Sequence, residues 1–89
     1  MSKEIEESML ATLTREQCRG ARAMLEMSRA DLAQRSEVAL RTIVDFESGA
    51  RTPYKRTLAC LRRALEDAGA VFIAAEDDLG PGVRLRNKP

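Results

Sequence analysis

Histidine is absent from this 89-residue sequence, and cysteine occurs only twice. Cys18 and Cys60 are far apart and form no C-x-x-C motif, so the spacing of a zinc site or a disulfide framework is missing. Paired acids in a plausible cleft and glycine-rich phosphate loops are missing too. We therefore expect no enzyme, metal or cofactor, and we interpret both cysteines as core thiols in a reducing cytoplasm.

Long apolar runs are also absent. The acidic first residues lack the apolar segment of a signal peptide, and no run approaches membrane-spanning length. Aromatic residues make up only 3% of the chain, whereas Leu, Ala, Arg and Glu dominate, which favours helices over sheet. The length suffices for one compact domain. We expect a mainly α-helical cytoplasmic protein that does not enter membranes.

The net charge of +1 is unevenly distributed. Residues 14–63 carry eleven Lys or Arg against six Asp or Glu, whereas the segments on either side are acidic. A basic middle between acidic ends suggests that the middle meets a polyanion, although a solvated helical surface would look the same.

Capping signals predict four helices in that middle. Thr14 with Gln17 fits a capping box for a helix ending near Glu26, and Ser28 with Asp31 starts a short helix that stops near Ser36. After a tight turn, a third helix shows an apolar stripe and ends at Gly49. A fourth helix is expected from Thr52-Pro53 to Gly69. The stripe of the third helix is Ala39, Ile43 and Phe46, and that of the fourth is Tyr54, Leu58, Leu61 and Leu65.

The two ends of the chain are interpreted separately from residues 13–69. Residues 1–12 predict an acidic tail, with at most a helical turn at 5–10. In residues 70–89, an apolar run at 70–74, a Gly-Pro-Gly turn at 80–82 and alternation at 83–86 predict an antiparallel hairpin. A lone hairpin leaves apolar surface uncovered, so Val71, Phe72 and Ile73 are candidate dimerisation residues, with packing inside one chain as the alternative.

Two short helices joined by a tight turn within a four-helix domain form the helix-turn-helix arrangement that reads DNA. Residues 13–65 resemble the lambda-repressor/Cro-like, or Xre, family of bacterial helix-turn-helix regulators, and residues 80–86 resemble a compact branch of it. The ordered set carries the resemblance, because each piece alone is weak. Its pieces are Ala21-Arg22, Leu25, Ser28, Asp31-Leu32-Ala33, Val38, Thr42-Ile43, Phe46-Glu47, Gly49, Arg51-Thr52-Pro53 and Thr57-Leu58.

The resemblance implies that the third helix contacts bases. Arg41 would donate twice to guanine, and Leu40 and Val44 would touch thymine methyl groups. Asp45 would accept from cytosine or hold Arg41 four residues away. Phosphate contacts are expected from Arg29, Thr42, Arg51, Lys55 and Arg56.

The resemblance also implies a structural ion pair between Arg22 and Glu47, which would orient the third helix. Three positions depart from the family pattern: Glu26 and Glu37 stand where glycine is usual, and Ala39 stands where Ser or Thr caps the third helix. These departures predict a strained turn and a missing cap.

These observations predict a four-helix lambda-repressor-like domain with a short C-terminal β-extension. The implied function is sequence-specific binding of double-stranded DNA as a homodimer, as a transcriptional regulator and specifically a repressor. The alternative is a protein-interaction module such as the antitoxin of a toxin–antitoxin pair, with the C-terminal tail holding the partner protein.

Overall fold

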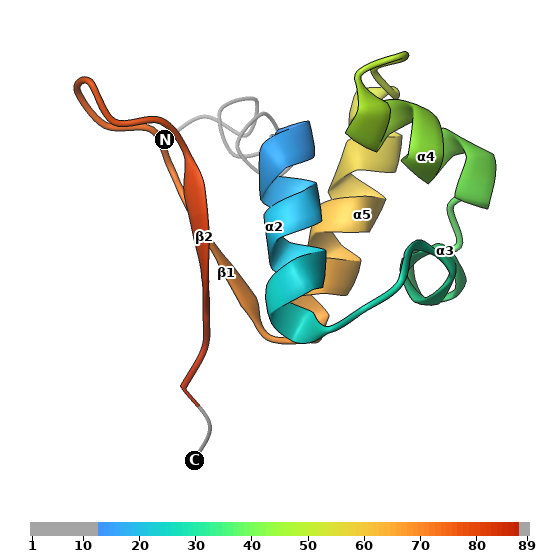
Figure 1. The fold of residues 1–89 in the computed structure, drawn as a ribbon, viewed down its shortest axis with the longest axis horizontal. Helices are drawn as coiled ribbons and strands as arrows, with labels where there is room; N and C mark the ends of the chain where they lie inside the picture. The colour runs from blue at the N-terminus through green and yellow to red at the C-terminus, as the bar shows by residue number, and fades with distance from the viewer. Residues whose placement is uncertain (1–12, 88–89) are drawn as a thin grey trace.

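The computed structural model describes residues 13–87. Within these residues, four helices are followed by an antiparallel two-stranded sheet (Figure 1). The helices are α2 (Arg15–Leu25), α3 (Arg29–Ser36), α4 (Leu40–Ser48) and α5 (Lys55–Asp67), and the strands are β1 (Ala70–Ile73) and β2 (Gly82–Leu85). The mainly α-helical class and the hairpin are confirmed; the tail expected at residues 1–12 lies outside the described residues.

The caps predicted at Thr14 and Ser28 are both present. Thr14 and Gln17 form a complete capping box at α2, and Ser28 and Asp31 form another at α3. These caps satisfy amide groups that the first turn of a helix leaves without partners, which explains where each helix begins. Gly49 ends α4 in the left-handed conformation, with φ at 86°.

The core lies between the four helices and the sheet. Side chains from every helix meet there, and Ala70 of β1 closes it on the sheet side. Leu32, Ile43, Leu61 and Leu65 are fully buried. Burial of a side chain of this size stabilises the fold by roughly 1.5–3 kcal/mol before the entropic cost of ordering the chain.

The hairpin packs against α2 and α5, on the side of the molecule away from α3 and α4 (Figure 1). The side chain of Val83 lies against Gly20 of α2, where an added Cβ would be 3.4 Å from Val83 Cγ1. The Gln17 side-chain amide donates to the Gly82 carbonyl at 3.0 Å. The sheet is therefore joined to the helical domain by both packing and hydrogen bonding.

Five details differ from the predictions. α5 begins at Lys55 after an extended Tyr54, so Thr52 is not its cap, and Tyr54 is 87% exposed instead of packed. The φ that proline fixes suits extended backbone as well as a first helical turn, which explains the misplaced start. Ala39 is exposed, because it precedes α4 with an extended ψ of 138° and is not part of its buried stripe.

The other two differences concern Cys60 and the turn of the hairpin. Cys60 is exposed, because it is rotated about 100° around α5 from the buried Leu61. The hairpin reverses at Asp77 and Asp78, between the bridged residues Glu76 and Leu79, and Gly82 already belongs to β2.

Candidate nucleic-acid interface

One side of α4 faces the core and the other side faces solvent. Ile43, Phe46 and Glu47 are buried. The four residues predicted to contact bases lie along the opposite side, since positions i, i+1, i+4 and i+5 share one helix surface. Among these four, Leu40 is 46% exposed, the Arg41 side chain is 86% exposed, and Val44 and Asp45 are half-buried.

Arg41 and Asp45 form an ion pair within α4. Arg41 Nε lies 3.4 Å from Asp45 Oδ1. This contact matches one of the two roles foreseen for Asp45, that of holding Arg41. An ion pair between residues four apart on a helix surface stabilises a protein by only about 0.3–0.5 kcal/mol. The main effect of this pair is therefore on the orientation of the Arg41 guanidinium.

The turn between α3 and α4 is tight and strained. Glu37 ends α3 with φ at 60°, in the left-handed region where glycine is favoured, and Glu26 takes a similar conformation after α2. No side chain caps α4 at Ala39, as expected. The buried Ser36 hydroxyl supports the turn, because it donates to the Leu32 carbonyl at 2.6 Å and accepts from the Val38 amide at 3.2 Å.

A carboxylate buried between three helices fixes the position of α4. The Glu47 side chain is 0% exposed and accepts from Arg22 of α2 at 2.6 and 2.7 Å. It also accepts from Arg29 Nε of α3 at 3.0 Å and from the Cys18 thiol at 3.2 Å. The predicted Arg22–Glu47 pair is therefore confirmed, with Arg29 as an additional partner.

The charge state of this cluster follows from its hydrogen bonds. Burial opposes ionisation of Glu47, but the bonds from Arg22, Arg29 and Cys18 outweigh it and lower the pKa of the carboxyl group. Burial and the neighbouring Glu47 raise the pKa of the Cys18 thiol. Cys18 therefore stays protonated at neutral pH and serves as a hydrogen-bond donor instead of a reactive thiol.

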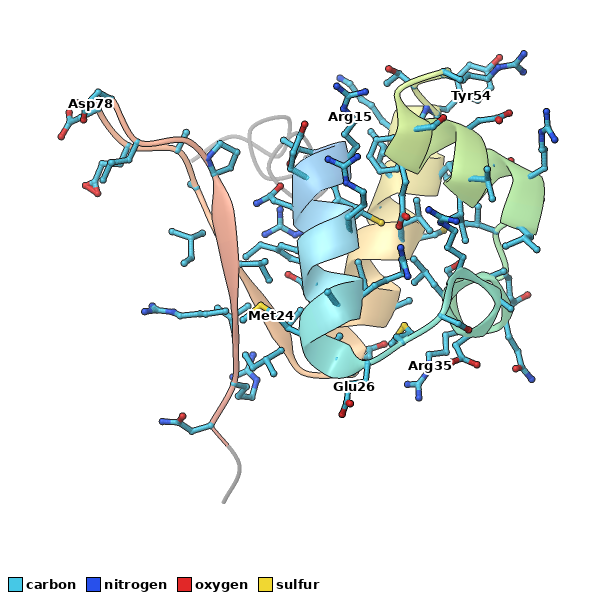
Figure 2. All side chains as sticks on the ribbon, viewed as in Figure 1. Arg15, Met24, Glu26, Arg35, Tyr54 and Asp78 are labelled. Carbon is cyan, nitrogen blue, oxygen red and sulfur yellow. The ribbon has the colours of Figure 1, made fainter. Side chains whose placement is uncertain are left out.

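Two arginines of α2 stabilise the C-terminal end of α4, and sequence reasoning missed both. Arg19 donates to the Glu47 carbonyl at 2.9 Å, and Arg15 donates to the Ser48 carbonyl at 3.3 Å. Figure 2 shows Arg15 at the end of the bundle where Tyr54 also lies. Cations at a helix C-terminus are favourable because they offset the negative end of the helix dipole.

The residues predicted to contact phosphates are distributed around the ends of α4. Three of them are exposed in the loop after α4 or at the start of α5: Arg51, Lys55 and Arg56. Thr42 lies within α4 itself and is half-buried. Arg29 remains 48% exposed while its Nε binds Glu47. Acidic residues of the hairpin turn lie elsewhere: Figure 2 shows Asp78 at the hairpin tip, far from α4.

The three candidate dimerisation residues do not share one surface. Successive residues of a strand point to opposite faces. Phe72 lies on the face that packs against the core, 5.1 Å below the Arg62 guanidinium. Val71 and Ile73 lie on the outer face together with Arg84, and Ile73 is 41% exposed.

Within residues 13–87 no group of side chains is arranged to hold a metal ion. None of the helices described is long and apolar enough to cross a membrane.

Comparison with protein-family models finds no match for this chain, and comparison with curated proteins finds no similar sequence.

Proposed function

We propose that this protein binds double-stranded DNA in a sequence-specific manner as a homodimer and acts as a transcriptional repressor of the lambda-repressor/Cro-like type. The observation that carries the proposal is the α3–turn–α4 pair. Glu47 holds the buried side of α4 against α2 and α3. The opposite side of α4 presents Leu40, Arg41 and Val44 to solvent. A helix fixed on one side and exposed on the other can enter a major groove.

The charge distribution supports the same orientation. In the proposed complex, the exposed Arg51, Lys55 and Arg56 contact phosphates beside the groove that α4 enters. Arg29 uses its Nε for Glu47, and the remaining donors of its guanidinium are available for a phosphate. The acidic hairpin turn lies far from this surface, where it does not repel DNA (Figure 2).

Selection from random duplexes at several salt concentrations tests the proposal. We expect an enriched palindrome with half-sites ~34 Å apart and a steep loss of affinity with salt. Lys55→Ala should weaken binding to all sequences and reduce the salt slope by about 1, whereas Arg41→Ala should relax one base preference. Arg63→Ala, which removes an exposed arginine of α5, is the control. If Lys55→Ala and Arg41→Ala bound DNA with the affinity and base preference of the wild type and of Arg63→Ala, the proposed surface would be contradicted.

Dimerisation is assigned to the outer face of the hairpin, where Val71 and Ile73 are accessible. Ile73→Lys should shift the protein from dimer to monomer in sedimentation equilibrium while its circular-dichroism spectrum stays that of the folded wild type, because Ile73 is already 41% exposed. A wild-type protein that stays monomeric, and binds its palindrome as one copy, would contradict this part of the proposal.

A second candidate function is that of a partner-binding antitoxin. The hairpin turn projects from the helical bundle (Figure 1), and its Leu79 is 69% exposed. A partner protein could therefore contact the hairpin turn while α4 is bound to DNA. Co-purification of a second chain that Leu79→Ser releases would support this function.

A further inference from the structure

Asp45 differs from Arg41, its partner in the ion pair, in how far its side chain is exposed. Its side chain is 22% exposed, compared with 86% for Arg41. Its carbonyl accepts from the amides of Ala50 and Arg51 at 2.9 and 3.2 Å, which fixes the last turn of α4 to the following loop. Asp45 is therefore the more buried member of the ion pair, and Arg41 is the member exposed to solvent.

The atom through which Arg41 is held determines what remains available. A guanidinium has five N–H donors, and the contact with Asp45 involves Nε. Both Nη groups stay in solvent, and a pair of N–H donors is what guanine O6 and N7 accept in the major groove. A carboxylate at Nε limits the conformations of Arg41 without occupying that pair.

We propose that Asp45 is a positioning residue for Arg41, so that the base pair read by Arg41 is G·C with guanine as the acceptor, and that Asp45 reads no base itself. This inference rests on the proposed DNA-binding function. Only Oδ1 of the carboxylate lies near Arg41, and a direct contact from Oδ2 to cytosine N4 would bring a half-buried anion closer to the phosphates, which is unfavourable.

The test is a double-mutant cycle read at single base pairs. Wild type, Arg41→Ala, Asp45→Ala and the double variant are each bound to duplexes that carry all four base pairs at every position of the selected half-site. Arg41→Ala should reduce the preference for guanine at one position by about tenfold, within the range of a bidentate contact. Asp45→Ala should reduce the preference at that same position by about threefold, the scale of an exposed ion pair.

Coupling between the two residues decides the outcome. In the Arg41→Ala background, Asp45→Ala should have no further effect on base preference, because the residue through which it acts is gone. Asp45→Asn, which keeps the shape but not the charge, should behave like Asp45→Ala while unfolding at the wild-type midpoint. The inference would be overturned, with DNA binding intact, if Asp45→Ala changed the preference at a different base pair. It would also be overturned if Asp45→Ala still changed base preference in the Arg41→Ala background. A wild-type protein with no base preference would overturn both.

Discussion

Replacing Glu47 with glutamine should destabilise this protein more than any other single neutralisation of an acidic side chain among residues 13–87. Four hydrogen bonds converge on its two buried oxygens, from Arg22 twice, Arg29 and Cys18. Glutamine would remove the charge and place an N–H₂ group opposite arginine donors. The Arg22 side chain is only 16% exposed, so its charge would be left largely buried and poorly paired.

The magnitude follows from the burial of the pair. Removing one partner of a buried ion pair costs about 3–5 kcal/mol. A chain of this length has a total stability of roughly 4–13 kcal/mol, so the loss is a large share of it. At about 4–8 °C per kcal/mol for a domain of this size, the unfolding midpoint should fall by at least ~12 °C.

Thermal and urea unfolding followed by circular dichroism would measure this loss. The matched control is Glu66→Gln, which neutralises the Arg62–Glu66 pair on α5, where the acid is 37% exposed. That change should cost no more than about 1 kcal/mol. If Glu47→Gln lost no more stability than Glu66→Gln, the argument that a buried carboxylate fixes α4 would be refuted.

Two further predictions concern pH and the strained turn. Because the folded-state pKa of Glu47 lies below its ordinary value of 4.5, the stabilisation that its carboxylate provides is present at neutral pH and is lost as pH falls from about 4.5 through the folded-state pKa. The free energy of unfolding should therefore fall less steeply with acid in Glu47→Gln than in the wild type, and equal slopes would contradict this role of Glu47. Glu37→Gly should raise the free energy of unfolding by about 1 kcal/mol, because glycine adopts the positive φ without strain. Ala39→Ser should raise it by about 1 kcal/mol as well, because serine can cap α4. Urea unfolding measures both changes, and a loss of stability in either variant would contradict the strained, uncapped turn.

Local signals made much of the fold predictable from the sequence. Capping boxes at Thr14 and Ser28 and the terminal Gly49 act within four residues of a helix end, so the chain itself displays them. The Arg22–Glu47 pair depends on residues 25 positions apart and was expected only from the family resemblance. Arg15 and Arg19, which support the C-terminal end of α4, had no such signal, because their partners are backbone carbonyls 33 and 28 positions away, respectively.

Each of the remaining errors has a local physical cause. Tyr54 and Ala39 were assigned to the core from apolar periodicity, and Cys60 was interpreted as a core thiol. The first two lie just before a helix begins, where that periodicity does not apply, and Cys60 lies at the margin of the apolar face. Phe72 and Ile73 were grouped with Val71 as dimerisation residues, although adjacent strand residues face opposite sides.

The most direct test is amide chemical-shift mapping of the protein with a selected duplex. We predict that the largest shifts fall on residues 40–45 and 51–56, with little change in the inner strand residues of the hairpin. Shifts concentrated on residues 76–80, or none at saturating DNA, would contradict the assignment of the exposed side of α4 to the major groove.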